Sequence, residues 1–170
     1  MSESQAREMA AGYDLHPAWR RDNKQFEQDA VDFWRRLGLL PADVDPEARA
    51  RELAAVAYKD GRLVAVTTLA IGRLEQVRAR IAMLRAATDP EHRRGHAANA
   101  LAIYTREIIE RWAGEHPDEK IGGMGAVIES PNLRGWEKQP LWPTTQLSLI
   151  GHTRDGRQIR LYWFRNFRLD

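Results

Sequence analysis

The stretch that decides the fold is Met83-Leu-Arg-Ala-Ala-Thr-Asp-Pro-Glu-His-Arg-Arg-Gly-His-Ala-Ala-Asn-Ala-Leu101. It begins as an extended segment, turns at Asp89-Pro90, and then opens a helix with arginines, a glycine and small residues. The first turn of a helix has backbone N–H groups without partners, and the helix dipole makes that end partly positive. Arg93 and Arg94 add charge, and short side chains let an anion reach the backbone. The stretch therefore predicts a phosphate or diphosphate site.

The segments around this stretch predict a crossover unit. Residues 77–88 form an extended run, and a helix is expected from Gly95 to Ala113, where Gly114 stops it. The apolar stripe of that helix consists of Leu101, Tyr104, Ile108 and Trp112. Residues 121–128 form the next strand. A strand, a helix and a strand in this order make the two strands parallel.

Two helices are expected further toward the N-terminus. The first begins at Asp22, which forms a capping box with Gln25, and ends at Gly38 before Pro41. Its buried face is given by residues at helical spacing, namely Phe26, Ala30, Phe33 and Leu37. A second, shorter helix is expected at 47–52.

The remaining segments alternate with the period of strands. Residues 53–59 and 63–74 are joined by Asp60-Gly61, a dipeptide that favours a tight type I′ turn. The second of these strands is apolar on both faces, so it should be central. A terminal hairpin of 146–153 and 158–169 turns at Asp155-Gly156. We expect the α+β (mixed α/β) class: a single domain, 1–170, whose central mixed, mostly antiparallel sheet is flanked by helices and carries a parallel strand pair around the crossover helix.

The segment 90–101 resembles the acyl-CoA-binding signature of the GNAT superfamily. In that family a strand runs into Pro-x-x-Arg/Gln-x-x-Gly-x-Gly/Ala, and a leucine follows on the helix. Pro90 and Arg93 match the first two positions. Ala98 matches the Gly/Ala position, and Leu101 matches the leucine.

One position departs from the signature. His96 stands where the family usually has glycine, and Gly95 lies one residue early. A second register would place Arg94 in the Arg/Gln position, Ala97 in the glycine position and Asn99 in the final Gly/Ala position. We prefer the first register, because it also aligns the proline. In it a β-carbon lies where backbone should approach the diphosphate.

The resemblance also implies a fold and a coenzyme site. The expected order of elements matches that of GNAT proteins over most of the chain, and in that family the two parallel strands splay apart to hold the pantetheine arm. The residues implied to contact acetyl-CoA or coenzyme A are Ala86, Ala87, Thr88, Arg93, Arg94, Gly95, His96, Ala97, Ala98 and Asn132. The backbone of Arg85 would line the same gap.

Acyl transfer to an amine also needs a proton acceptor and a group that polarises the thioester carbonyl. Backbone N–H groups near residues 86–88 could polarise the carbonyl. Glu129 follows a strand that should face the cleft, so we name it as the base; the alternative is a solvated carboxylate at a strand end. The resemblance implies a tyrosine acid several residues after Asn132, but that window holds Trp136 and Pro140 instead.

Composition excludes several other classes of protein. The 170 residues contain no cysteine, which excludes disulfides, a thiol nucleophile and thiolate zinc sites. No apolar run reaches the roughly 18 residues of a membrane helix, and the polar start is not a secretory signal, so we expect a cytoplasmic protein. The net charge of +2 does not call for nucleic acid. The aromatic and cationic run 162–168 would suit the binding of single-stranded nucleic acid, but it equally suits a half-buried terminal β-strand.

Three further patterns were weighed. His92 and His96 have the spacing of helical metal ligands, but the arginines between them disfavour a metal, and none is expected. The glycines of 122–125 lack the third glycine of a dinucleotide loop. Trp136 and Trp142 would serve as core residues, walls of the acceptor site or contacts of a homodimer.

The sequence thus predicts an acyl-CoA-dependent N-acyltransferase, with acetyl as the acyl group and a small-molecule or peptide amine as the acceptor. The acceptor would lie between the helix that begins at Asp22 and the loop 130–145. A second reading is a catalytically degenerate GNAT-fold protein that binds acyl-CoA or an acyl carrier as a sensor or scaffold. His96 and the missing tyrosine favour this second reading.

Overall fold

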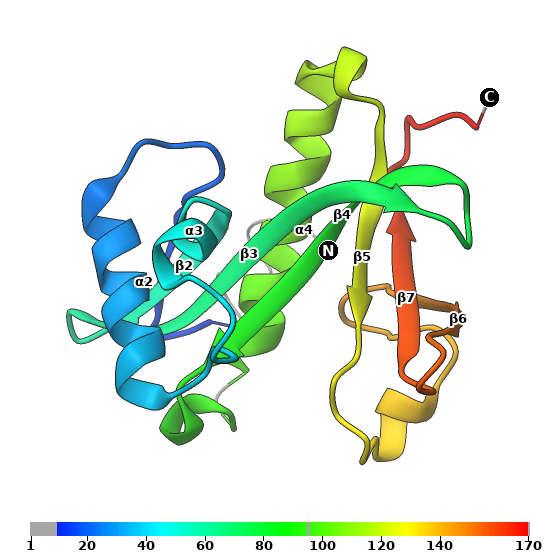
Figure 1. Ribbon diagram of the computed structural model, residues 1–170. Coiled ribbons are helices and arrows are strands. Elements are labelled where there is room, and N and C mark those ends of the chain that lie inside the picture. Colours follow the sequence, from blue (N-terminus) through cyan, green and yellow to red (C-terminus); the bar gives the residue numbers. More distant parts are fainter. Residues whose placement is uncertain (1–9, 95, 170) are drawn as a thin grey trace. The chain divides into compact units, whose positions relative to one another are not determined.

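The structure is a computed structural model that describes residues 10–94 and 96–169. Seven strands form one mixed, mostly antiparallel sheet in the order β1-β2-β3-β4-β5-β7-β6 (Figure 1). The strands are β1 (Asp14–Pro17), β2 (Leu53–Lys59), β3 (Arg62–Leu74), β4 (Ala79–Thr88), β5 (Ile121–Val127), β6 (Ser148–His152) and β7 (Gln158–Trp163). The helices are α2 (Lys24–Leu37), α3 (Pro46–Ala50) and α4 (Ala97–Glu115), with the short 3-10 helices η1 (Pro90–His92), η2 (Pro117–Glu119) and η3 (Gly135–Lys138). The α+β class is confirmed.

The chain divides into two compact units, which are described separately. Unit 1 comprises residues 10–69 and Arg85–Ile108, and unit 2 comprises Ala70–Leu84 and residues 109–169. In unit 1, β2 pairs with β1 on one side and with β3 on the other, both antiparallel. The hairpin between β2 and β3 turns at Asp60 and Gly61, which have φ angles of 50° and 75°, as the type I′ turn requires.

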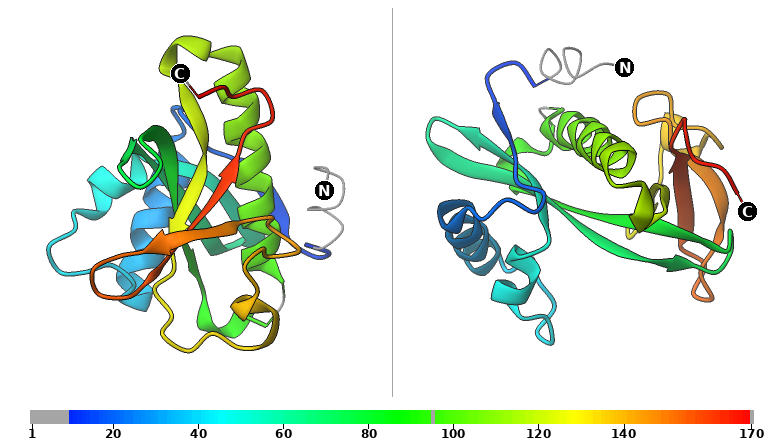
Figure 2. Two further views of the ribbon diagram at one scale, coloured as in Figure 1. Left: turned by 90° about the vertical axis from the view of Figure 1, so that its right-hand side faces the viewer. Right: turned by 90° about the horizontal axis from the view of Figure 1, so that it is seen from above.

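Unit 1 has an apolar core on each face of its sheet. On one face α2 and α3 pack against Val56, Leu63 and Val66. On the other face the first half of α4 packs against Ala55, Ala57, Val64 and Ala65 through Leu101, Ile103 and Tyr104. Figure 2 shows these helices on opposite sides of the strands. The central position of β3 is therefore confirmed.

The observed ends of α2 differ in part from the prediction. The cap is Asn23, whose side chain accepts the Phe26 N–H at 3.1 Å, so the capping box at Asp22 is wrong. The helix begins one residue later than predicted, because Asn23, at φ −117°, still has extended backbone. Gly38 ends the helix with a left-handed φ of 60°, as predicted.

Unit 2 contains the parallel pair. β4 and β5 run parallel, with Arg80 opposite Ile121 and Met83 opposite Gly125, and β4 continues beyond this register to Thr88. β5 then pairs antiparallel with β7, which pairs with β6. The parallel crossover prediction is confirmed.

The glycines of β5 are explained by close packing rather than by a nucleotide loop. A β-carbon on Gly122 would come 2.7 Å from the ring of Phe167, and one on Gly123 would come 2.4 Å from the carbonyl oxygen of Tyr162. Only glycine fits where another chain segment lies this close. The prediction that 122–125 is strand is confirmed.

Several predicted boundaries were wrong. α4 begins at Ala97 and continues through Gly114 to Glu115, because a glycine inside a helix costs only about 1 kcal/mol and does not end it. The predicted start at Gly95 lies outside the described residues. The strands of the terminal hairpin are shorter than expected, and β1 was missed because four residues carry too little pattern. Within the described residues, no helix is both long and apolar enough to cross a bilayer.

Candidate active site

The turn that follows β4 is anchored by a buried carboxylate. Asp89 is 3% exposed, and its N–H donates to the Val64 carbonyl at 2.8 Å. Its side chain accepts the Glu91 N–H at 3.1 Å and two contacts of 3.3 Å from the guanidinium of Arg36 on α2. Burial by itself raises the pKa of Asp89, but the Glu91 N–H and the Arg36 guanidinium hold that pKa below its ordinary value. Asp89 is thus a charged cap for η1.

The next side chain in the turn is also fixed. Tyr13 lies 3.1 Å from Nδ1 of His92 through its hydroxyl, and the two rings meet edge to face. The ammonium of Lys59 lies 4.9 Å from the centre of the Tyr13 ring. His92 therefore packs against the segment that leads into β1. Within the described residues, no group of three or more histidine or acidic side chains could hold a metal.

The two arginines of the turn have no carboxylate partner in the part of the chain that the structure describes. Arg93 and Arg94 are both exposed, and Arg93 has helical backbone angles of φ −63° and ψ −28°. Among the residues that the structure describes, no acidic side chain forms an ion pair with either guanidinium. Two unpaired guanidiniums beside a helix start are the arrangement that phosphate oxygens favour. Gly95, which follows them, lies outside the described residues.

The residue that precedes α4 has left-handed backbone. His96 has a left-handed φ of 58°, a conformation that glycine adopts without strain. The Ala100 N–H donates to the His96 carbonyl at 3.0 Å. The first turn of a helix has N–H groups that precede its own hydrogen bonds, and an anion can accept from them. A left-handed residue at 96 agrees with the register in which His96 occupies the glycine position.

The strand end beside this turn presents small side chains. Ala86 is exposed, Thr88 is half-buried, and Ala87 packs against the α2 core. Arg85 is held by Glu52 through a contact of 3.1 Å. We call residues 85–98 the motif segment, and all of it belongs to unit 1.

The other two predicted site residues lie in unit 2. Glu129 and Asn132 both line a cavity of about 720 Å³. We call it the hairpin cavity, and its wall consists of residues 128–134, Lys138, His152 and residues 155–158. The structure thus brings Glu129 and Asn132 to one cavity of unit 2, and the described contacts 86–88, 93–94 and 96–98 lie in unit 1.

Glu129 is bound by an arginine. Both carboxylate oxygens of Glu129 lie 2.8 Å from Nη1 of Arg157, and Asp155 lies 2.8 Å from the Nε of the same guanidinium. The hydrogen bond to Glu129, followed by the charge of Asp155, raises the pKa of Arg157. The Glu129 side chain is 75% exposed, so water screens this pair. The guanidinium favours the charged carboxylate and so makes Glu129 a weaker proton acceptor.

A buried arginine organises the loop beside this cavity. Arg160 on β7 is 0% exposed and stacks on Trp142, with 4.2 Å between the guanidinium carbon and the ring centre. It donates at 2.9–3.3 Å to Gln158 Oε1 and to the carbonyls of Glu137, Gln139, Pro140 and Leu147. Burial lowers its pKa from the ordinary value. Trp142 is therefore part of a packed loop core, while Trp136 meets it edge-on and stays 38% exposed.

Sequence reasoning missed three of these contacts. Asp89 was recognised as a strand stop, but its pairing with Arg36 across 53 positions has no local signal. The Tyr13 contact with His92 depends on the strand that was not predicted. Arg160 looked like any charged residue of a half-buried strand, and the run of prolines and tryptophans before it was the available hint.

Comparison with solved structures identifies the fold. An acetyltransferase of the GNAT family from Streptococcus pneumoniae matches with a TM-score of 0.58 and 12% identity, covering 89% of this chain and 99% of the other. The ribosomal-protein-S5-alanine acetyltransferase from Vibrio fischeri matches with a TM-score of 0.60 and 8% identity, covering 93% and 96%. The protein yncA from Salmonella typhimurium, solved with its cofactor acetyl-CoA, matches with a TM-score of 0.58 and 14% identity, covering 93% and 97%.

The chain therefore has the GNAT fold, as the resemblance of 90–101 implied. No family model and no curated protein matches the chain by sequence. At these identities the likeness establishes the fold, and the chemistry has to be argued from the residues of this chain.

Proposed function

We propose that this protein is an acyl-CoA-dependent N-acyltransferase that transfers an acetyl group to an amine. The observation that carries the proposal is the start of α4. There a left-handed residue precedes α4, after a strand of the GNAT sheet, and among the described residues the two neighbouring guanidiniums have no carboxylate partner. A diphosphate is stabilised at such a helix start by hydrogen bonds and by the helix dipole.

The coenzyme would be held by the motif segment. Arg93, Arg94 and the backbone of 95–98 would contact the diphosphate, and the backbone of 86–88 would contact the pantetheine arm. Ala97 and Ala98 carry the shortest side chain that a helix start commonly has, which supports this assignment, although Ala97 itself is buried. We include Asn132 as a further contact. We also propose that 1–170 acts as one acyltransferase domain, with the cytoplasm as its place of action.

The reaction would proceed by direct attack. The amine nitrogen attacks the thioester carbonyl carbon, a C–N bond forms, the C–S bond breaks, and coenzyme A leaves as the thiolate. We propose Glu129 as the acceptor of the proton that the amine loses. The thiolate would take its proton from water or from another group, because the expected tyrosine is absent after Asn132.

A second candidate is a GNAT-fold protein that binds an acyl-CoA or an acyl carrier without transfer. The pairing of Glu129 with Arg157 favours it, because both carboxylate oxygens are engaged by one guanidinium. In either case the motif segment binds the coenzyme, and the candidates differ only in turnover. The acceptor of the first candidate would be a small molecule or a peptide amine, and a homodimer is compatible with both.

One titration tests the coenzyme and a second assay tests turnover. Acetyl-CoA at a hundred times its dissociation constant should raise the free energy of unfolding by about 2.7 kcal/mol. The absence of any stabilisation by acetyl-CoA and longer acyl-CoAs would exclude both candidates. Release of free thiol that depends on an amine would select the acyltransferase, whereas stabilisation without release across an amine panel would select the binder.

A further inference from the structure

Unit 2 contains a larger cavity that shares no residue with the proposed coenzyme and acceptor sites. Its volume is about 950 Å³, at the upper end of the range for small-molecule sites. We call it the C-terminal cavity, because the end of the chain forms one wall. Its lining comes from the β3–β4 turn and the start of β4 (Arg73, 77–80), the end of α4 (Glu110, Ala113, Gly114), residues 117–121, and the C-terminal segment (Phe164, 166–169).

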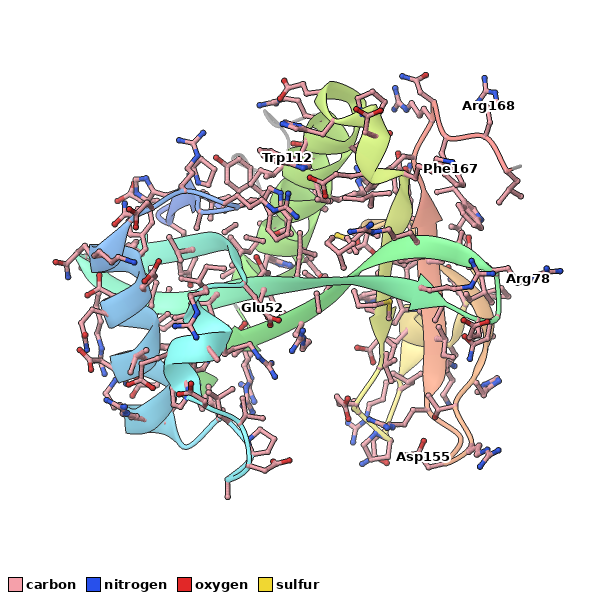
Figure 3. The ribbon with its side chains drawn as sticks, turned by 45° about the horizontal axis from the view of Figure 1, so that its top comes forward. Glu52, Arg78, Trp112, Asp155, Phe167 and Arg168 are labelled. Atoms are coloured by element: carbon pink, nitrogen blue, oxygen red, sulfur yellow. The ribbon has the colours of Figure 1, made fainter. Side chains whose placement is uncertain are left out.

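The C-terminal wall is held in place by specific contacts. Phe164 donates its N–H to the Gly122 carbonyl at 2.9 Å, and the ring of Phe167 stacks on Trp163 with planes 6° apart. The Phe167 ring fills the space where Gly122 lacks a side chain. Figure 3 shows Phe167 and Arg168 at the upper right, Arg78 below them at the right edge, and Asp155 at the bottom. The cavity therefore has a defined wall rather than a loose terminus.

The cavity has an excess of positive charge. Its lining contains five cations, Arg73, Arg78, Arg80, Lys120 and Arg168, and three acids, Glu110, Asp118 and Glu119. Among the described residues, no acidic side chain pairs with Arg78, Arg80 or Arg168, and Arg168 donates only to backbone carbonyls.

Two of the three acids are occupied by other groups of the protein. Glu110 accepts the Arg165 N–H at 3.0 Å and the Tyr162 hydroxyl at 3.4 Å. Glu119 accepts the indole N–H of Trp112 at 3.3 Å. The guanidiniums of Arg78, Arg80 and Arg168 can therefore bind a ligand. A guanidinium binds a phosphate group through two parallel hydrogen bonds.

The rest of the lining offers apolar surface and carbonyl groups, which a simple anion would leave unused. Phe167, which is half-buried, and Leu169, which is exposed, supply apolar surface that a ring can cover. The last turn of α4, at Ala113 and Gly114, offers carbonyl groups without helical partners, and these accept hydrogen bonds from a ligand. A ligand that satisfies all three features carries phosphates, an apolar ring and hydroxyl or amino donors.

We propose that the C-terminal cavity binds a nucleoside polyphosphate, with Arg78, Arg80 and Arg168 on the phosphates. The inference does not depend on acyl transfer. It also assigns a function to the run 162–168, whose aromatic and cationic residues are not used by the coenzyme site. The volume of about 950 Å³ fits a single nucleotide.

Equilibrium binding of ADP tests the proposal. Because coenzyme A itself contains an ADP group, the measurement is made in the Arg93→Ala/Arg94→Ala protein, in which the motif segment is disabled. ADP should bind this protein at 0.15 M salt, and it should bind more tightly than inorganic phosphate does. Adding Arg80→Gln and Arg168→Gln should weaken ADP by about tenfold or more, since each removes charge-assisted bonds. Arg154→Gln, a matched loss of charge at an exposed position outside the cavity, should change the affinity by less than about twofold.

Three results would overturn the proposal. One is no ADP binding once Arg93 and Arg94 are replaced. Another is equal ADP affinity with and without Arg80 and Arg168, in variants whose circular dichroism and melting are unchanged. The third is an oligonucleotide that binds far more tightly than ADP and depends on the same arginines, which would make this face a nucleic-acid surface instead.

Discussion

The carboxylate of Asp89 lies 3.3 Å from the guanidinium of Arg36 and so ties the turn after β4 to α2. The same carboxylate caps η1, so one buried charge both binds α2 and holds the 3-10 helix that precedes α4. The start of α4 is therefore held by protein contacts, before any ligand binds. Such preorganisation lowers the entropy cost of binding a phosphate group.

Asp89→Asn should lower the free energy of unfolding by about 1–2 kcal/mol at pH 7, because the amide keeps the cap but loses the charge. The pKa of Asp89 is lowered in the folded protein, so its contribution is present above the ordinary carboxyl pKa of about 3.9. That contribution is lost as the pH falls through the folded pKa. Urea denaturation between pH 7 and pH 3 should show a steeper acid loss for the wild type than for Asp89→Asn. Parallel curves would contradict the ion pair.

His96→Gly should stabilise the protein by roughly 1 kcal/mol, because glycine adopts the left-handed conformation at 96 without a steric cost. It should also tighten coenzyme A binding several-fold, since it removes the side chain nearest the amide groups of α4. Gln146→Gly is the matched control, with an exposed side chain at φ 60°. The control should gain similar stability with no change in affinity. If both variants changed coenzyme affinity alike, the special role of position 96 would be refuted.

Arg160→Met should lower the free energy of unfolding by at least about 3 kcal/mol, because it leaves buried carbonyls without donors. The free energy of unfolding of Arg160→Lys should lie between those of the wild type and Arg160→Met, because an ammonium has three donors and cannot reach all the carbonyls. Arg154→Met, at an exposed position, serves as the control. Chemical denaturation followed by tryptophan fluorescence measures all three. A loss for Arg160→Met no larger than that of the control would show that the guanidinium does not hold the loop.

Glu129→Gln should lower the turnover number and leave the affinity for coenzyme A nearly unchanged, because the amide cannot accept a proton. Steady-state kinetics with an accepted amine, together with coenzyme titration, separates the two quantities. An unaltered pH–rate profile would exclude Glu129 as the base. In that case the carboxylate serves only its contact with Arg157.

The sequence predicted the elements that carry strong local signals. The α2 face, the Asp60-Gly61 turn and the parallel crossover all follow from spacing or turn chemistry within a few residues. Boundaries were less accurate where two neighbouring residues could serve equally, as with Asp22 and Asn23 at the α2 cap. Gly114 was given too much weight as a stop signal.

The candidate site was predictable only where it is contiguous. The motif segment could be identified because the helix start requires charge and small residues in one short run. Asp89 with Arg36, and Glu129 with Arg157, are joined by the fold across 53 and 28 positions, which no local pattern encodes. The left-handed backbone of His96 was also unexpected, because glycine is the usual residue for that conformation.

The most direct test of the central claim compares coenzyme A with pantetheine, which lacks the phosphates, on the wild type and on Arg93→Ala. If the start of α4 binds the diphosphate, Arg93→Ala should weaken coenzyme A by about tenfold or more and leave pantetheine almost unaffected. Equal losses for the two ligands, or no loss of coenzyme A affinity, would contradict the account.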